Sequence, residues 1–260
     1  MPEKLLRIAI LDADHLYPEL VDIYQSYGRM FEQLFAAVLE RTPQLFGEDF
    51  ILQTQRFDVV SGVYPESLDC FDGVLVTGSK ADAFSDEAWV QQLRDYAVDL
   101  LEAKIPTAGI CFGHQLLALV AGGKVDRAAN GWGVGINHYQ VPKAAAGWLA
   151  ELGFSPAKRE QTDLVLIASH QDQVLALPAN AQLLAGNAFC PNAGFRIENH
   201  LLSFQGHPEF TGDYLKALMT LRRERVGEAN YQKACASVGA PHHGHDIGQL
   251  MLKFFAASKS

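Results

Sequence analysis

The chain has 260 residues, 48% of them hydrophobic and 20% charged, so it can bury a sizeable core and wholesale disorder is excluded. Its formal net charge of −9 argues against non-specific nucleic-acid binding, and no stretch approaches the length of a membrane span. The four cysteines do not make a disulfide framework and there is no N-terminal secretion signal, so we expect a cytoplasmic protein.

The first half of the chain alternates strand-like and helix-like segments. Short apolar runs predict strands over 5–11, 50–60, 73–77 and 106–110. Apolar residues at helical spacing predict helices over 29–41, 86–103 and 112–121, the last ending at a Gly-Gly pair. This alternation favours an α/β fold with a mostly parallel central sheet and helices on both faces.

The middle of the chain, from 124 to about 204, has a different pattern. It contains short β-like segments separated by turns, at 136–141, 164–169, 181–186, 194–197 and 201–205. We expect these segments to be antiparallel additions to the sheet or a flanking β layer. The predicted fold therefore includes a smaller antiparallel β portion.

The last part of the chain is predicted to be helical. One helix is expected from Thr211 to Arg225, and its basic cluster RRER at 222–225 fits a solvated helix face. Residues 226–260 are predicted to form a helical tail with a polar interruption, HHGHD. The simplest account of residues 1–260 is a single domain with a core of about 1–225 and a helical C-terminal extension of about 226–260.

A cysteine between two glycines, in GICFG at 109–113, joins a predicted strand to a predicted helix. The pattern G-x-C-x-G has the shape of a nucleophile elbow, a sharp turn that lifts one side chain out of the sheet. The helix N-terminus would favour the thiolate of Cys111, and the N–H of Phe112 could donate to an oxyanion. The alternative is a small buried side chain at a tight turn.

A partner for this cysteine is available in QGHPEF at 205–210, directly after a predicted strand. Pro208 favours extended geometry at His207, and residues i and i+2 of an extended segment project to the same side. Glu209 could therefore accept from one ring nitrogen of His207 and leave the other facing Cys111. The alternative is a surface turn.

Several motifs in order resemble class I glutamine amidotransferases. They are VLVTGSKADAFSDEAW at 74–89, PTAGICFGHQLLALVAGGKV at 106–125, GWGVGINHY at 131–139, SHQDQV at 169–174 and SFQGHPEF at 203–210. The sequence is most similar to the subgroup like the glutaminase domain of GMP synthetase, in a stand-alone form. The resemblance implies a flavodoxin-like fold, with Cys111 as nucleophile, His207 as general base and acid, and Glu209 as the orienting carboxylate.

The resemblance also implies residues that bind the substrate. The backbone N–H groups around Gly78 and Ser79, with that of Phe112, would bind the oxyanion. Gln115 resembles the glutamine-contacting glutamine of the family, with a purely structural hydrogen bond as the alternative. His170 and Asp172 are expected to line the pocket or contact a partner, unless they form only a polar turn.

Two other motifs are given structural interpretations. The glycines of GWGVG at 131–135 lack the dinucleotide-binding spacing, so we expect a glycine-rich β-turn near the pocket. The run HHGH at 242–245 is not completed by further ligands, so no metal site is predicted, and no cofactor is expected.

The resemblance to class I glutamine amidotransferases leads to three hypotheses about the function. The first is a cysteine-dependent glutamine amidotransferase or glutaminase, which forms a γ-glutamyl thioester on Cys111 and releases glutamate and ammonia. Because no P-loop or S-G-G-x-D-S signal is present, a separate synthetase subunit would have to use the ammonia.

The second function is a γ-glutamyl peptidase or hydrolase that acts on γ-glutamyl peptides or amines with the same triad. The third is a non-catalytic thiol sensor or interaction module, against which the H-x-E motif at 207–209 weighs. The expected ligand is therefore glutamine or another γ-glutamyl small molecule, with no nucleic acid and no membrane among the partners.

Overall fold

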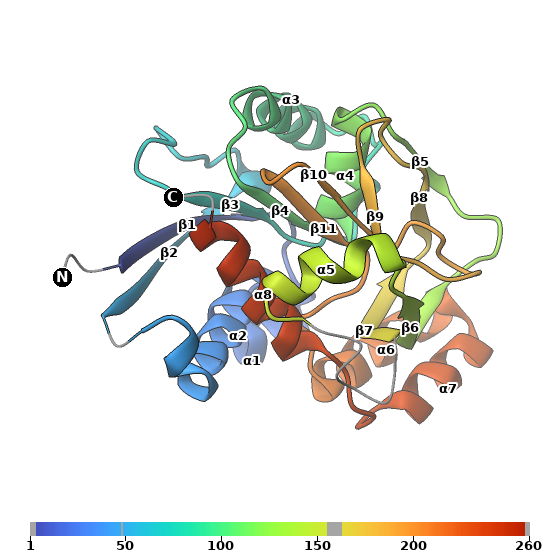
Figure 1. The fold of residues 1–260 in the computed structure, drawn as a ribbon. Coiled ribbons are helices and arrows are strands. Elements are labelled where there is room, and N and C mark those ends of the chain that lie inside the picture. Colours follow the sequence, from blue (N-terminus) through green and yellow to red (C-terminus); the bar gives the residue numbers. More distant parts are fainter. Residues whose placement is uncertain (1–3, 48, 155–162, 258–260) are drawn as a thin grey trace.

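The computed structural model describes residues 4–47, 49–154 and 163–257. Its centre is a seven-stranded sheet with the strand order β2–β1–β3–β4–β11–β10–β9 (Figure 1). Five neighbouring strands run parallel, and β10 and β9 complete the sheet through antiparallel pairing. Their bounds are Lys4–Asp12 (β1), Phe50–Asp58 (β2), Gly73–Val76 (β3), Thr107–Ile110 (β4), Gln182–Ala185 (β9), Gly194–Ile197 (β10) and Leu201–Phe204 (β11).

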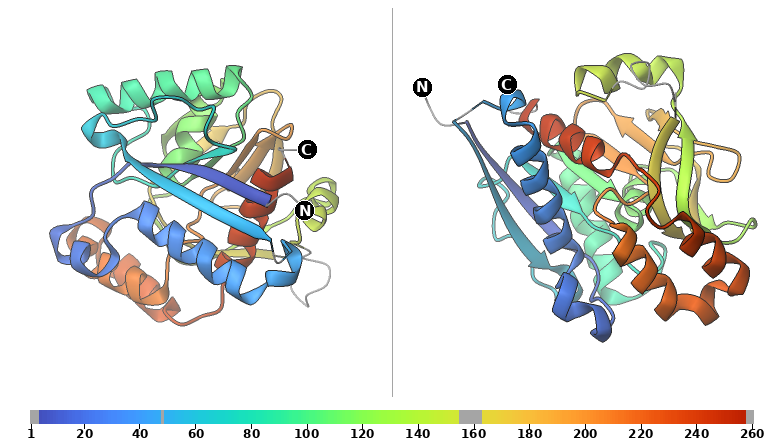
Figure 2. Two further views of the ribbon diagram at one scale, coloured as in Figure 1. Left: turned by 90° about the vertical axis from the view of Figure 1, so that its left-hand side faces the viewer. Right: turned by 90° about the horizontal axis from the view of Figure 1, so that it is seen from below.

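Helices cover both faces of this sheet, as the left view of Figure 2 shows. One face carries α2 (Tyr27–Arg41) and α8 (Gly244–Ala257), and the other carries α3 (Ala88–Glu102) and α4 (Phe112–Val120). Alternate residues of β1 divide between the two cores: Ile8 belongs to the α2/α8 cluster and Ala9 to the α3/α4 cluster. The predicted parallel sheet with helices on both faces is confirmed.

Two antiparallel pairs lie beside the sheet and confirm the smaller antiparallel portion. One joins β5 (Lys124–Arg127) to β8 (Asp172–Ala176), and the other joins β6 (Gly133–Gln140) to β7 (Asp163–His170). Strands β5 and β8 were not predicted from the sequence. Both are short, and each has exposed residues, so neither carries a strong apolar pattern.

The strand predicted at 201–205 has a more central place than expected. β11 pairs parallel with β4, from Leu201 opposite Thr107 to Phe204 opposite Ile110, and is antiparallel only to β10. This parallel pairing aligns the ends of β4 and β11 at one edge of the sheet. The local pattern could not reveal it because the partner strand is about 90 residues away.

The glycine-rich segment at 131–135 is only partly a turn. Gly131 has a φ of 80°, as in a turn, but β6 already begins at Gly133. The structure also contains helices that were not predicted from the sequence. They are α1 (Pro18–Tyr24), α5 (Lys143–Glu151) and two short 3-10 helices at Pro43–Leu45 and Val59–Ser61.

The C-terminal part contains α6 (Gly212–Val226), α7 (Glu228–Ser237) and α8. The segment before α8 is joined to β7, because His243 N donates to Val165 O at 2.7 Å and Val165 N donates to His243 Nδ1 at 3.0 Å. Helix α8 then lies against α2, and most of its side chains are buried in the main core. The end of the described chain is therefore packed against one face of the sheet.

Within the described ranges, no helix combines the length and apolar character needed to cross a bilayer. All four cysteines, Cys70, Cys111, Cys190 and Cys235, are free thiols. Among the residues with described positions, no group of three or more His, Cys, Asp or Glu side chains is arranged to hold a metal ion.

Candidate active site

Cys111 lies between the end of β4 and the start of α4, with a φ of 53° and a ψ of −100°. A positive φ is disfavoured for a residue with a β-carbon and costs about 1–3 kcal/mol, so the surrounding structure must impose it. Two hydrogen bonds hold the turn: Cys111 N donates to Phe204 O at 2.9 Å, and Gly113 N donates to Thr77 O at 3.2 Å. This is the strained strand-to-helix turn that the G-x-C-x-G motif predicts.

The two glycines of the motif are required by close packing. A β-carbon on Gly109 would lie 2.6 Å from both Gly113 O and Leu117 Cδ1, and one on Gly113 would collide with Val76 O. Helix α4 therefore passes directly over the ends of β3 and β4. As a result the Cys111 side chain is held at the carboxyl edge of the parallel strands.

His207 and Glu209 follow β11 and lie next to this turn. His207 N donates to Ile167 O at 2.8 Å, which fixes the backbone, and the imidazole Nδ1 is 2.7 Å from Glu209 Oε1. The ring also stacks on Phe210, with centroids 3.8 Å apart and an interplanar angle of 12°. When Nδ1–H donates to the carboxylate, Nε2 is left for the side of the ring that faces Cys111.

The electrostatics of His207 favour its protonated form. Burial alone would lower the pKa of His207, but the carboxylate of Glu209 and the thiolate of Cys111 outweigh it and raise that pKa to about 10. A hydrogen bond between the Cys111 and His207 side chains adds to the effect. The three side chains thus form one buried hydrogen-bonded unit, in which each group is less than a tenth exposed.

Two backbone segments, at Gly78 and at the start of α4, lie next to Cys111. A β-carbon on Gly78 would lie 2.9 Å from His207 Cε1 and 3.7 Å from Cys111 Cβ, so only a glycine fits beside both side chains. Phe112 is the first residue of α4, and its N–H therefore has no acceptor within the helix. These are the positions at which an oxyanion would find donors.

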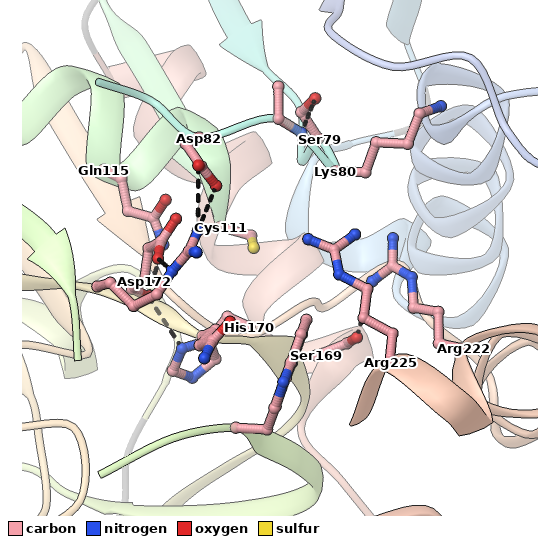
Figure 3. Close-up of a pocket in the computed structure, with 14 residues that line it drawn as sticks. Ser79, Lys80, Asp82, Cys111, Gln115, Ser169, His170, Asp172, Arg222 and Arg225 are labelled. Atoms are coloured by element: carbon pink, nitrogen blue, oxygen red, sulfur yellow. Dashed lines mark hydrogen bonds and ion pairs between the residues drawn. The ribbon is translucent and has the colours of Figure 1, made fainter. Parts of the chain in front are cut away.

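Cys111 lines a pocket at the surface of the protein. Of the predicted site residues, Ser79, Cys111, Gln115, His170 and Asp172 line it, whereas His207 and Glu209 are buried and do not line it. The complete lining comprises Ser79, Lys80, Ala81, Asp82, Cys111, Gln115, Arg127, Trp132, Ser169, His170, Gln171, Asp172, Arg222 and Arg225 (Figure 3).

The polar groups at one side of the pocket form a connected network. Gln115 Nε2 donates to Asp172 O at 2.8 Å and to Gln205 Oε1 at 3.1 Å. The Asp172 carboxylate accepts from Arg127 Nε at 3.1 Å, and the same guanidinium reaches both oxygens of Asp82 at 3.0 Å. Burial, aided by Asp82 and opposed by Arg127, raises the pKa of Asp172 to about 6.

His170 and Asp172 do not form a second histidine–carboxylate pair. His170 Nδ1 lies 3.1 Å from the backbone oxygen of Asp172, while the Asp172 carboxylate faces Arg127. Burial lowers the pKa of His170 to about 4, so the ring is neutral near pH 7. A rival triad at this loop is therefore absent, and both residues lie at the wall of the pocket.

Several pocket residues were not predicted from the sequence, and one expectation is corrected. The cluster at 222–225 was expected on a solvated helix face, but Arg222 is only 6% exposed and lines the pocket together with Arg225. Positions i and i+3 of a helix share a face, so the spacing of the two arginines was the available signal. Asp82 and Trp132 lie within the motifs at 74–89 and 131–139 but were not singled out there, and Arg127 lies in none of the motifs.

Comparisons with known proteins identify the family of this chain. Residues 20–220 match the family described as glutamine amidotransferase class-I. The chain is 37% identical over 175 residues to gamma-glutamyl peptidase 3 of Arabidopsis thaliana, covering 65% of this chain and 68% of that protein. It is 30% identical over 190 residues to the glutamine-hydrolysing GMP synthase of Streptococcus mutans, covering 72% of this chain and 32% of that protein.

The fold has a counterpart among solved structures. A glutamine amidotransferase from Thermotoga maritima superposes with a TM-score of 0.70 at 18% identity, and the match covers 96% of each chain. At this level of identity the likeness concerns the fold.

Proposed function

Because this chain belongs to the class I glutamine amidotransferase family, we propose that it hydrolyses γ-glutamyl amide bonds, with Cys111 as the nucleophile. The observation that carries the proposal is the conformation of Cys111, which has a φ of 53° beside an imidazole hydrogen-bonded to Glu209. A buried cysteine with only a structural role gains nothing from such a backbone, whereas a nucleophile needs it.

In the first step the Cys111 thiolate attacks the γ-carbonyl carbon of the substrate. The carbonyl oxygen becomes an oxyanion, which the N–H groups of Phe112 and of the Gly78–Ser79 turn would stabilise. The proton held on His207 then passes to the departing nitrogen as the carbon–nitrogen bond breaks, and this leaves a γ-glutamyl thioester on Cys111.

In the second step water replaces the departed amine. His207, now neutral, takes a proton from the water as its oxygen attacks the thioester carbonyl. The carbon–sulfur bond breaks, glutamate leaves, and the proton on His207 restores the thiolate–imidazolium pair. Glu209 keeps the ring oriented and stabilises its positive charge throughout.

Two classes of leaving group fit this chemistry. If the substrate is glutamine, the leaving group is ammonia, and a separate synthetase subunit would be the partner that uses it; the resemblance to a GMP synthase supports this reading. If the substrate is a γ-glutamyl peptide, the leaving group is the amine of the peptide. We favour the peptide, because relatives at 31–38% identity are named gamma-glutamyl peptidases.

The test is to incubate the purified protein separately with glutamine and with a panel of γ-glutamyl dipeptides and amines, and to measure the glutamate released. We expect turnover that requires the thiol, with kcat/KM larger for the peptides than for glutamine. Absence of glutamate release from every compound would overturn the proposal, whereas a dominance of glutamine would overturn only the preference for peptides.

Substitutions at the three side chains should separate their roles. We expect Cys111→Ala and His207→Ala to abolish turnover, and Glu209→Ala to keep a larger residual rate, because orientation is lost less completely than a nucleophile or a base. A glutamine-analogue electrophile should label the native protein but not the Cys111→Ala variant. Equal labelling of the two proteins would exclude Cys111 as the nucleophile.

A further inference from the structure

The pocket beside Cys111 has two sides with different charge. On one side Asp82 and Asp172 lie together, and on the other the guanidinium groups of Arg222 and Arg225 lie together, with Cys111 between them (Figure 3). The first side offers both signs of charge, because Arg127 bridges the two carboxylates. The second side offers positive charge.

Arg222 is a buried cation without a carboxylate partner. It is 94% buried, and its Nη1 donates to Ser169 Oγ at 3.1 Å while its guanidinium lies 5.7 Å from the centre of the Tyr17 ring. Its Nε, also buried, has no hydrogen-bond acceptor among the residues that the structure describes. Asp14 interacts with Arg222 electrostatically but lies beyond 4.0 Å. Burying an arginine without a carboxylate in direct contact is costly, and an anion in the pocket would offset that cost.

Arg225 reinforces this positive side. It lies one turn further along α6 and is exposed, with its guanidinium 5.4 Å from the centre of the Trp132 ring. The other basic groups of the pocket are already paired, since Lys80 contacts Asp14 at 2.8 Å and Arg127 contacts Asp82 and Asp172. Within the described part of the chain, neither Arg222 nor Arg225 has a carboxylate within 4.0 Å.

We propose that Arg222 and Arg225 bind a carboxylate carried by the leaving group, so that the preferred substrates are γ-glutamyl amino acids and peptides with a free C-terminal carboxylate. The proposal rests on the proposed γ-glutamyl hydrolase function and specifies its substrate class. Neither ammonia nor a simple amine has an anionic group to place beside these two guanidinium groups.

The division of charge supports this orientation of the substrate. The α-carbon end of a γ-glutamyl group is zwitterionic, with an ammonium and a carboxylate, and it matches the side on which Asp82, Arg127 and Asp172 present both signs of charge. The nitrogen that leaves must then lie toward the opposite side, where α6 presents its two arginines. A guanidinium binds a carboxylate through two parallel hydrogen bonds, and a C-terminal carboxylate is such a group.

The test compares two substrates that differ only in the charge of the leaving group, γ-glutamylglycine and γ-glutamylglycinamide. For the native protein we expect kcat/KM to be about tenfold or more higher for the acid, as for a charge-assisted hydrogen bond. The readout is kcat/KM for the acid divided by kcat/KM for the amide, called the ratio of acid to amide below. A substitution that merely disturbs the fold lowers both rates together and leaves the ratio unchanged.

Two substitutions remove the positive side. Arg225→Gln changes an exposed residue and should fold normally, whereas Arg222→Met keeps the volume but removes a buried charge. Each should lower the ratio of acid to amide several-fold toward one, and Arg225→Lys should retain part of the preference. The matched control is Arg223→Gln, on the same helix, because Arg223 pairs with Glu228 and does not line the pocket.

The outcomes separate this inference from the proposed function. If neither compound nor glutamine releases glutamate, the hydrolase function fails. If both are cleaved with equal kcat/KM by the native protein, or if Arg225→Gln lowers kcat/KM by the same factor on both, the function stands and the assignment of Arg222 and Arg225 to the leaving group is overturned. A fall in the ratio with Arg225→Gln but not with Arg223→Gln supports it.

Discussion

The arrangement around Cys111 depends on individual side chains and on glycines. The residue holds a positive φ because Gly109 and Gly113 let α4 approach the strands, and because hydrogen bonds from Cys111 N and Gly113 N fix both sides of the turn. His207 is held equally firmly, by its backbone bond to Ile167, by Glu209 and by the ring of Phe210. The cluster is therefore organised before any substrate arrives.

At the residue scale, Glu209→Gln should change the pH dependence of the reaction. The amide oxygen can still accept from His207 Nδ1, but the negative charge that raises the pKa of His207 to about 10 is lost. Less stabilisation of the imidazolium lowers that pKa, so the alkaline limb of kcat/KM should move to lower pH. The measurement is kcat/KM from pH 5 to 10.5, with circular dichroism to show that both proteins stay folded.

The control for this prediction is Glu228→Gln, which removes one negative charge from an exposed ion pair with Arg223. Its alkaline limb should coincide with that of the native protein. An alkaline limb that stays in place in Glu209→Gln would show that Glu209 does not set the charge of His207.

At the scale of elements, the carboxyl ends of the parallel strands gather the site. β4 ends at Ile110, directly before Cys111, and β11 ends at Phe204, three residues before His207. Their parallel pairing brings together residues about 95 positions apart. The sequence predicted both strands and both motifs, since each is a local pattern. It could not predict that the β11 partner is β4, because strand pairing depends on the packing of the whole sheet.

Helix α8 is a second element whose place the sequence left open. Phe255 is fully buried and packs directly against Gly73 at the start of β3. We expect Phe255→Ala to lower the free energy of unfolding by about 3–5 kcal/mol, since it leaves a cavity in the main core. Urea denaturation followed by circular dichroism measures the change.

The control is Leu221→Ala on α6, because Leu221 is 37% exposed and its truncation should lower the free energy of unfolding much less. A loss below about 1 kcal/mol in Phe255→Ala would mean that α8 does not unfold together with the sheet.

At the scale of the whole molecule, buried histidines couple stability to pH. Burial lowers the pKa of His114 to about 3, and its Nδ1 is 2.8 Å from Ser203 Oγ. An unfolded chain binds a proton at this histidine near pH 6.5, but the folded chain does not, so stability falls as the pH falls below 6.5. His170, with a pKa of about 4, also lowers the stability of the fold as the pH falls.

Replacing His114 should therefore weaken the acid sensitivity of the fold. We expect the free energy of unfolding of His114→Asn to fall with decreasing pH less steeply than that of the native protein, by about 1.4 kcal/mol per pH unit between pH 6 and 4.5. The comparison is of slopes, since the substitution also changes stability at pH 7.

The comparison is restricted to pH values below 6.5 because, at higher pH, the titration of His207 changes the stability of the fold in the opposite direction. Its raised pKa contributes stability that is complete below 6.5 and is lost as the pH rises toward 10. Leu221→Ala serves as the control, since it removes an exposed side chain that does not titrate and should leave the slope unchanged. An unchanged slope in His114→Asn would exclude His114 as a source of acid sensitivity.

The sequence by itself determined the elements and chemistry that local patterns encode. These are the alternation that predicts a parallel sheet, the cysteine elbow, and the H-x-E pair whose spacing alone lets His207 and Glu209 meet. The tertiary structure decided what depends on contacts between distant segments: the pairing of β4 with β11, the burial of α8, and the two charged sides of the pocket. Arg222 shows the reason, because whether a cation on a helix faces water or a pocket is set by what packs against that helix.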